Sequence, residues 1–184
     1  MPCHHFDTRW SEPENSDLPA FVTGRHFDVL ASNAAAQLIS PELAPGHNRL
    51  RSVFLVQAER ELYRDWEATA RRFVAVVRET VGRGATDPSF SSLAEELSLR
   101  SARFRQLWNR HDVVARDTEH AILRHPLAGE LRLHLERLGI AGTAGQSLVV
   151  YHPEQGSEDA RRLTDFLHGQ PSRPHGSGPF DLGS

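Results

Sequence analysis

Two stretches of the sequence place aromatic side chains beside Arg, His or Asp at short offsets, a third places leucines beside Arg and His, and these residues could do chemistry. The three stretches are Asn48–Glu67, Phe104–Val113 and His125–Glu136. A carboxylate buried among apolar side chains needs a charge-assisted hydrogen-bond donor, because an unpaired anion there is costly. Arginine can hold a carboxylate through two parallel hydrogen bonds. The candidate donors for such a ligand are Arg51, Tyr63, Arg110 and His111.

The apolar members of the same stretches, together with Phe73 and Tyr151 outside them, are candidates for the wall of a ligand pocket. They are Trp66, Phe73 and Trp108 on predicted helices, and Leu133, Leu135 and Tyr151 on predicted strands. Aromatic residues at helical spacing are also typical of an ordinary core. The sequence leaves both interpretations open, a cavity that holds a ligand and a core filled by its own side chains.

Motifs of catalysis and of metal binding are weak by comparison. The chain has no G-x-S-x-G, no P-loop and no G-x-G-x-x-G after a predicted strand. His111-Asp112 would serve a small hydrolase or isomerase only if the histidine were perturbed inside a cleft. A metal site needs several converging ligands, and neither Cys3-His4-His5 nor the pair His120 and His134 offers a complete set. We therefore predict that the protein is not an enzyme and has no metal or cofactor.

Composition places the chain among soluble proteins that do not bind nucleic acid by themselves. Its 184 residues carry a formal net charge of −3, whereas a nucleic-acid binder usually has a basic face. All 21 basic residues are arginine, which indicates a high-GC, actinobacterial type of coding bias. The neighbouring pair Arg71–Arg72 is interpreted as part of a solvated helix face.

Cysteine use and hydropathy predict a cytoplasmic protein. Cys3 is the only cysteine, so no intramolecular disulfide can form. The N-terminus lacks the apolar region of a secretory signal. The longest apolar runs, such as Phe73–Val77, are too short to cross a membrane.

Local signals predict a hairpin followed by several helices. Strands over Ala20–Thr23 and His26–Ala31 flank Gly24-Arg25, and Ser32 or Asn33 can cap a helix that ends at Ile39. The further helices are expected over Asn48–Leu55, over Ala58–Leu62, from an N-cap at Asp65 to Gly82 or Gly84, after Asp87-Pro88, and from Ser101.

The C-terminal third changes to the period of β-strands. Glu119–Arg124, Gly129–Arg137 and Gln146–Tyr151 read as strands, and a last helix covers Ser157–Leu167. Together with the hairpin they predict an α+β fold, a PAS-like five-stranded antiparallel sheet with the helices on one face. We expect a flexible leader over 1–16, one domain over 17–168 and a flexible tail over 169–184.

Six blocks in a fixed order resemble the ligand-binding domain of MmyB-like bacterial transcription regulators. The similarity spans Leu18 to Leu167, and its blocks read VTGRHFDVLASNAAA, LRSVFL, ELYRDWEATARRFVAVVR, ELSLRSARFRQLWNRHDV, HPLAGELRLHLERL and QSLVVYHPEQGSEDARRL. The resemblance implies a PAS-like sensor domain that binds a fatty-acid-like molecule in an apolar cavity. In that family the domain follows an N-terminal helix-turn-helix.

The chain departs from the family pattern at several places. The helix-turn-helix is missing before the first predicted strand, Val56-Gln57 replaces the usual Asp-Pro, and Gly139–Gly145 is rich in Gly and Ala. Two functions are carried forward. One is a sensor of an amphiphilic small molecule, which acts through a homodimer or a full-length regulator and does not contact DNA or membranes itself. The other is a dimerisation module with a filled core and no ligand.

Overall fold

The computed structural model describes residues 18–82, 88–110 and 120–169. Its strands are β1 (Ala20–Thr23), β2 (Val29–Ser32), β3 (His120–His125), β4 (Gly129–Gly139) and β5 (Ser147–His152). Its helices are α1 (Ala34–Ile39), the 3₁₀ helix η1 (Pro41–Leu43), α2 (Arg49–Leu55), α3 (Gln57–Leu62), α4 (Trp66–Gly82), α5 (Pro88–Arg100), α6 (Ala102–Asn109) and α7 (Glu158–His168). The predicted leader over 1–16, and the predicted tail beyond Gly169, lie outside the described residues.

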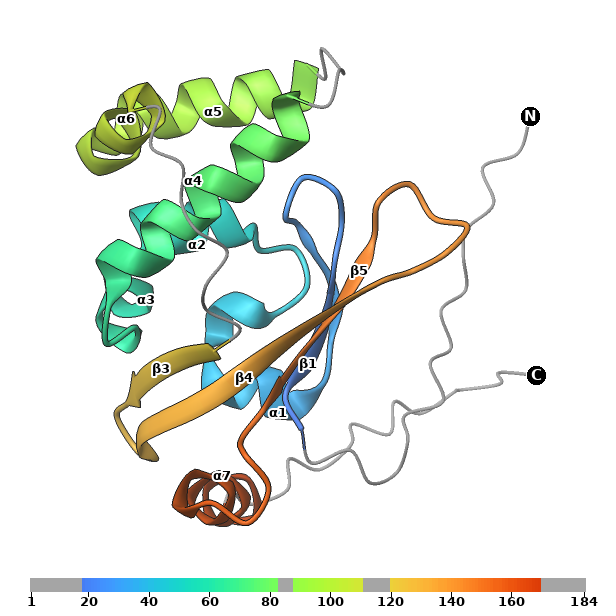
Figure 1. Cartoon of the computed structure of the whole chain (residues 1–184), viewed down its shortest axis with the longest axis vertical. Coiled ribbons are helices and arrows are strands. Elements are labelled where there is room, and N and C mark those ends of the chain that lie inside the picture. The colour runs from blue at the N-terminus through green and yellow to red at the C-terminus, as the bar shows by residue number, and fades with distance from the viewer. Residues whose placement is uncertain (1–17, 83–87, 111–119, 170–184) are drawn as a thin grey trace, which may run out of the picture.

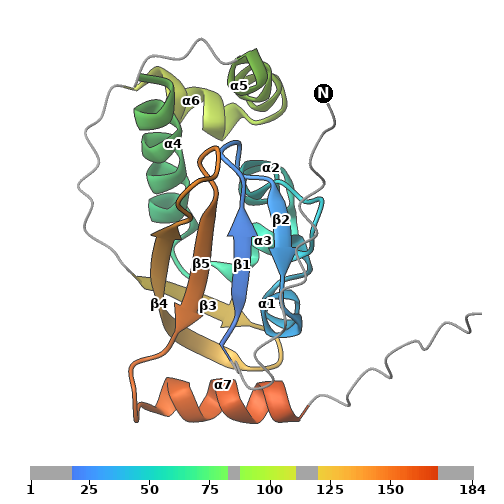
Figure 2. The same ribbon diagram turned by 90° about the vertical axis from the view of Figure 1, so that its right-hand side faces the viewer.

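The strands form one antiparallel sheet in the order β2-β1-β5-β4-β3. The N-terminal hairpin therefore pairs with the last strand, so that β5 lies at the centre between β1 and β4. Helices α1 to α6 lie on one face of the sheet, as Figures 1 and 2 show from two directions. The predicted α+β class and the five-stranded antiparallel sheet are confirmed, and the likeness to PAS domains stays a prediction.

Capping side chains begin several helices at the predicted residues. Asn33 Oδ1 accepts from Ala36 N at 2.9 Å at the start of α1. Asn48 does the same for α2, Asp65 for α4, Ser101 for α6 and Ser157 for α7. Each bond satisfies a backbone N–H that has no partner within its helix.

The hairpin differs from the prediction at its turn. The second strand begins at Val29, so five residues connect the strands in place of the expected Gly24-Arg25 turn. Gly24 N donates to Asp28 O at 2.9 Å, and Phe27 adopts a left-handed conformation with φ of 67°. The pairing also slips by one residue between Val22 and Thr23. Phe27 is buried within the turn, because the loop bends over the helical side.

Strand β4 shows the predicted alternation. Leu131 and Leu133 are fully buried and Leu135 is half-buried, whereas Arg132 and Glu136 on the opposite face are exposed. The core lies between this inner face of the sheet and the helices. The inner face therefore supplies the wall against which any ligand on the helical side must lie.

Helix α7 lies apart from the layer that the other helices form over the sheet (Figure 2). Leu163 and Phe166 are its buried side chains, and the Phe166 ring lies 4.5 Å from the ring of His125 at the end of β3. The helix thus closes the end of the sheet where β3 turns into β4 (Figure 1). In the described ranges, no helix combines the length and the hydropathy needed to cross a bilayer.

Candidate ligand pocket

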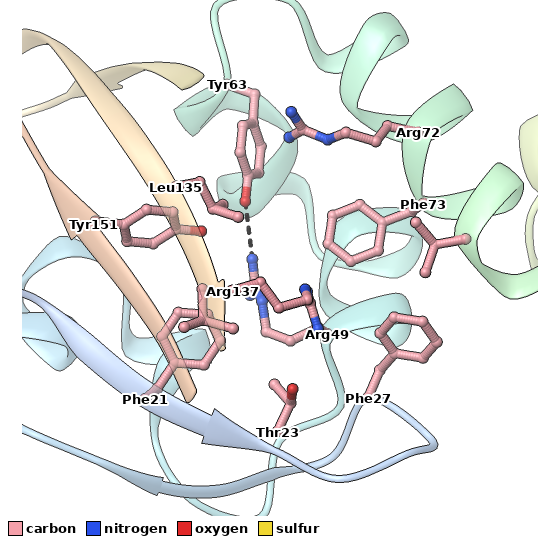
Figure 3. Close-up of a pocket in the computed structure, with 12 residues that line it drawn as sticks. Phe21, Thr23, Phe27, Arg49, Tyr63, Arg72, Phe73, Leu135, Arg137 and Tyr151 are labelled. Atoms are coloured by element: carbon pink, nitrogen blue, oxygen red, sulfur yellow. Dashed lines mark hydrogen bonds between the residues drawn. The ribbon is translucent and has the colours of Figure 1, made fainter. Parts of the chain in front are cut away.

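A pocket of about 100 Å³ lies between the inner face of the sheet and α4. Five segments that are far apart in the sequence meet there, namely the hairpin, the start of α2, the end of α3, α4 and the pair β4–β5 (Figure 3). Its lining residues are Phe21, Thr23, Phe27, Arg49, Tyr63, Arg72, Phe73, Val76, Leu135, Arg137, Val149 and Tyr151.

Strand register builds the sheet side of the pocket. Val149 on β5 lies opposite Phe21 on β1 and also opposite Arg137 on β4, and Tyr151 lies opposite Leu135. Paired residues of antiparallel strands point to the same face. Because the inner face continues past Leu135, Arg137 is carried onto the pocket side near the end of β4.

The lining side chains differ in exposure, so that the pocket has a buried floor and an exposed mouth. Thr23, Arg49 and Tyr63 are almost completely buried. Val76 is 38% exposed and Arg137 is exposed, so these residues mark the mouth. A ligand that enters beside α4 would meet the guanidinium group of Arg137 at the mouth and that of Arg49 at the floor.

The start of α2 fixes the position of Arg49. Asn48 Nδ2 donates to His26 O and to Asp28 Oδ1, both at 2.8 Å, while Arg49 N donates to Phe27 O at 2.9 Å. These bonds tie the helix to the loop of the hairpin. Arg49 and Phe27 are thereby held next to each other on the floor.

Arg49 belongs to a buried ion pair. Its Nη2 donates to Glu59 Oε1 at 2.6 Å. The same nitrogen donates to the Tyr63 hydroxyl at 2.9 Å (Figure 3). Ser40 Oγ donates to the other Glu59 oxygen at 2.6 Å. The two charged side chains are only 3% and 1% exposed, so they are compensated by each other and not by water.

Arg49, Glu59, Tyr63 and Ser40 form a buried cluster. Within it, Arg49 and Tyr63 keep a fixed protonation state. Burial by itself would lower the pKa of Arg49, but the interactions with Tyr63 and Glu59 outweigh it, and the pKa is raised above its usual range. Burial raises the pKa of the Tyr63 hydroxyl well above its ordinary value. The floor therefore presents a permanent cation and a neutral phenol.

Two polar atoms of the floor are buried without a hydrogen-bond partner among the described residues, Arg49 Nη1 and Thr23 Oγ1. Most buried polar atoms in proteins are hydrogen-bonded, because an unpaired one keeps its full desolvation cost. Both atoms belong to side chains that line the pocket.

Two pairs of aromatic rings face each other across the pocket. Phe27 and Phe73 form the helical side, with ring centres 6.2 Å apart, and Phe21 and Tyr151 form the sheet side at 5.8 Å (Figure 3). Phe27 holds its ring there at the cost of a left-handed backbone, which is unfavourable for a bulky residue. The walls suit an apolar chain or ring.

The charge of the lining is positive. Three of the residues that line the pocket are arginine and none is aspartate or glutamate. Desolvation lowers the pKa of the Arg137 guanidinium, and the positive charge of Arg72 lowers it further. The mouth therefore favours an anionic group.

Tyr63, Phe73, Leu135 and Tyr151 are the predicted site residues that the structure brings together in the pocket. Other predicted residues lie elsewhere in the core. Leu133 is completely buried. Trp66 donates from Nε1 to Val53 O at 2.8 Å, and Trp108 stacks on Phe104. Their roles as ligand contacts stay predictions.

Of the predicted carboxylate donors that the structure describes, Tyr63 lines this pocket and Arg51 and Arg110 do not. Arg51 makes a bidentate ion pair with Glu96 on the surface, in which Nη2 donates to Oε2 at 2.7 Å and Nε donates to Oε1 at 3.2 Å. Arg110 is the exposed C-cap of α6. His111 and Asp112 lie outside the described residues.

Sequence reasoning missed the arginines that do line the pocket. Arg137 continues the alternation of Leu131, Leu133 and Leu135, so the period of β4 already pointed it inward. Arg72 is half-buried and lines the pocket beside exposed Arg71, a role that the solvated-face interpretation did not include. Arg49 gave one indirect signal: Glu59 shares a helix face with buried Leu62, and a buried carboxylate needs a partner.

A metal ion would need several ligating side chains that converge on one point. Among the described residues, no group of three or more His, Cys, Asp or Glu side chains is arranged to hold one. His134 and His152 stack across β4 and β5 at 5.2 Å, and His120 lies 6.2 Å from His134 on the other side. The motif Cys3-His4-His5 lies outside the described residues.

Comparison with known proteins adds one match. The family model described as MmyB-like transcription regulator ligand binding domain matches residues 14–167. No curated protein matches the chain. The matched range includes every residue that lines the pocket.

Proposed function

The chain belongs to the family of MmyB-like transcription regulator ligand-binding domains, and on this premise we propose that it senses a fatty-acid-like amphiphile in the pocket beside α4. It is a ligand-sensing domain of a regulator family, so a small-molecule ligand is expected. The observation that carries the proposal is the pairing of apolar walls with arginine at the floor and the mouth.

The charge distribution sets the direction of the ligand. An acid group lies at the mouth beside Arg137 and Arg72, where water still reaches it and the guanidinium charges stabilise it. The apolar part lies between the aromatic pairs. The opposite direction would bury an anion beside Glu59, and like charges repel strongly at low dielectric.

The size of the pocket couples binding to a movement. A cavity of about 150 Å³ is known to hold a single benzene, and this pocket has about 100 Å³. A long acyl chain therefore fits only if Phe73 and Val76 move away from the sheet. Both side chains belong to α4, so the ligand selects a state in which α4 is displaced.

The attachments of α4 determine where such a movement goes. Its first turn is held by the bond from Trp66 Nε1 to Val53 O, and the preceding Arg64 N donates to Ile122 O at 2.9 Å. Farther along, Arg78 Nη2 donates to Leu107 O of α6 at 2.7 Å. The first turn is thus the pivot, and displacement of the later turns carries α6 with it.

The regulatory output passes through a partner. The displaced α4 and α6 change a surface that contacts a second copy of the chain or a full-length regulator. DNA is then read by the helix-turn-helix of a full-length regulator. This assignment follows the family plan, in which the sensor and the DNA reader are separate domains.

The first test is native mass spectrometry of freshly purified protein, followed by organic extraction. We expect an adduct that extracts as an amphiphilic acid. A second test uses displacement of the fluorescent acid cis-parinaric acid from the full chain. A protein that carries no extractable acid and does not bind this probe contradicts the proposal.

A matched pair of variants places the binding site. Val76→Phe adds a ring at the mouth, and Leu99→Phe adds a ring at a position on α5 that is 76% exposed. Blocking a charge-assisted contact costs about 1.5–3 kcal/mol, so Val76→Phe should weaken binding roughly tenfold to a hundredfold. Leu99→Phe should bind like the wild type. Equal binding by both variants would move the site away from this pocket.

The small volume also favours a second candidate, a dimerisation module that needs no ligand. In that case both binding tests are negative while the chain still forms a dimer. Sedimentation equilibrium of wild type and Val76→Phe, run without any acid, measures the dimer directly.

A further inference from the structure

The floor of the pocket holds two hydrogen-bonding atoms that the ligand can engage. Arg49 Nη1 and Thr23 Oγ1 are buried, lack a partner among the described residues, and belong to lining side chains that are 3% and 2% exposed. The rest of the buried cluster is saturated, since both Glu59 oxygens accept bonds from Arg49 and Ser40. The two atoms are therefore the chemical features left to recognise a ligand at this depth.

The charge balance of the floor decides what kind of group fits. Glu59 already neutralises Arg49 at 2.6 Å, and Arg49 Nη2 is occupied by Glu59 and Tyr63. A carboxylate on the floor would make the cluster net negative in a buried place and could not use the Nη1–Nη2 edge for two parallel bonds. A neutral oxygen avoids both costs, because it needs one donor at a time.

A carbonyl oxygen matches this pair of atoms. It has two lone pairs, so one oxygen can accept from Arg49 Nη1 and from the Thr23 hydroxyl. A bound water could occupy the same place, but a water needs two to four polar partners, and the remaining walls are mostly aromatic or aliphatic. A carbonyl attached to an apolar chain satisfies the two atoms and fills the space between the rings.

We infer that the ligand is an oxo acid, with its carboxylate at the mouth beside Arg137 and a neutral carbonyl at the far end on Arg49 and Thr23. This inference rests on the proposed function, because it assigns the chemistry of the same pocket. It adds a specificity that an unsubstituted fatty acid lacks. A plain acid can fill the apolar part, but it leaves the two buried atoms of the floor unsatisfied.

The test compares matched probes on the full chain by isothermal titration. The probes are the straight-chain acids from butanoic to decanoic and, for each length, the analogue with an oxo group next to the terminal methyl. At the best length we expect the oxo acid to bind about tenfold more tightly than the plain acid, the factor typical of one hydrogen bond to a charged donor.

Two threonine variants separate the floor from general effects. Thr23→Val removes the unpaired hydroxyl and keeps the shape of the side chain, so it should fold and should reduce the preference for the oxo acid by about threefold or more. Thr69→Val is the control, since Thr69 is also buried but its hydroxyl donates to Asp65 O within α4. It should keep the preference of the wild type.

The outcomes distinguish this inference from the proposed function. Equal affinity for plain and oxo acids overturns the oxo-acid inference and leaves the amphiphile sensor standing, with water on the floor. An oxo preference that Thr23→Val does not change overturns the assignment of the floor. If no acid of any length binds, both the proposed function and this inference are overturned.

Discussion

The buried pair of Arg49 and Glu59 makes a strong prediction about stability. Both side chains are almost fully buried, and the guanidinium nitrogen and carboxylate oxygen are 2.6 Å apart. Replacement of one partner leaves the other as an uncompensated buried charge, which costs about 3–5 kcal/mol. We expect Arg49→Met and Glu59→Leu each to lower the free energy of unfolding by about this amount.

The double variant should behave differently from the sum of the single ones. Replacing a buried ion pair by apolar side chains of similar volume is often neutral or stabilising. Arg49→Met combined with Glu59→Leu should therefore unfold within about 1 kcal/mol of the wild type, which gives a coupling free energy of at least about 3 kcal/mol. Urea denaturation followed by far-UV circular dichroism measures all four proteins.

The surface pair of Arg51 and Glu96 supplies the control. It has the same residue types and a similar distance, 2.7 Å, but its side chains are 47% and 28% exposed. Exposed ion pairs contribute only about 0–1 kcal/mol, because water screens them. If Arg49→Met costs no more than Arg51→Met and the double variant is additive, solvent reaches the floor and the reasoning is refuted.

Three further predictions concern the elements around the pocket. Burial lowers the pKa of His125 below its usual 6.5, so the unfolded chain takes up the proton first and the free energy of unfolding should fall as the pH drops below about 6.5. His125→Asn should lose that slope in denaturant titrations at several pH values, and an unchanged slope would contradict it. Asn33→Ala removes the cap of α1 and should cost about 1–2 kcal/mol in thermal unfolding, whereas a change below about 0.5 kcal/mol would show that water replaces the cap. Leu133→Ala should lower the free energy of unfolding by about 2–5 kcal/mol, measured by urea denaturation. Phe73→Ala should lower it by less than the usual range of about 3–5 kcal/mol for such a truncation, because the Phe73 ring borders open space. A loss at Phe73 that equals or exceeds the loss at Leu133 would contradict this ranking.

Local signals explain why so many helix starts could be predicted. Each cap is an interaction between a side chain and a backbone N–H two or three residues later, so a short window contains all the information. Asn33 and Asp65 illustrate this, because their side chains bond to the first turns of α1 and α4 as predicted. The alternation along β4 is local in the same sense.

The prediction of the hairpin turn was wrong because contacts from a distant part of the sequence hold the loop. Gly24-Arg25 resembles a two-residue turn, but the loop is held by Asn48, whose side chain bonds to His26 and Asp28, 22 and 20 positions away. Tertiary hydrogen bonds can outweigh local turn preference. They also hold Phe27 in its left-handed conformation, which no local preference would select.

Which side chains face the pocket depends on the register of strand pairing, which cannot be read from the sequence. Thr23 and Arg137 both lie on strands beside β5, so they face the same cavity because of how β1 and β4 pair with that strand. A shift of one residue in either pairing would turn the side chain to the opposite face. The identity of the wall residues was therefore predictable where alternation sufficed, whereas the polar floor was not.

Leu133 and Phe73 now separate the two functions that the sequence left open. Leu133 is fully buried whether or not a ligand exists, so its loss reports on the core alone. Phe73 packs its ring against that of Phe27 and borders the pocket, so its ring has room to move with α4. A filled-core module gives both residues the same role, and both truncations would then only destabilise. A sensor makes Phe73 the residue at which binding and stability change in opposite directions, because a smaller side chain enlarges the site while it weakens the packing.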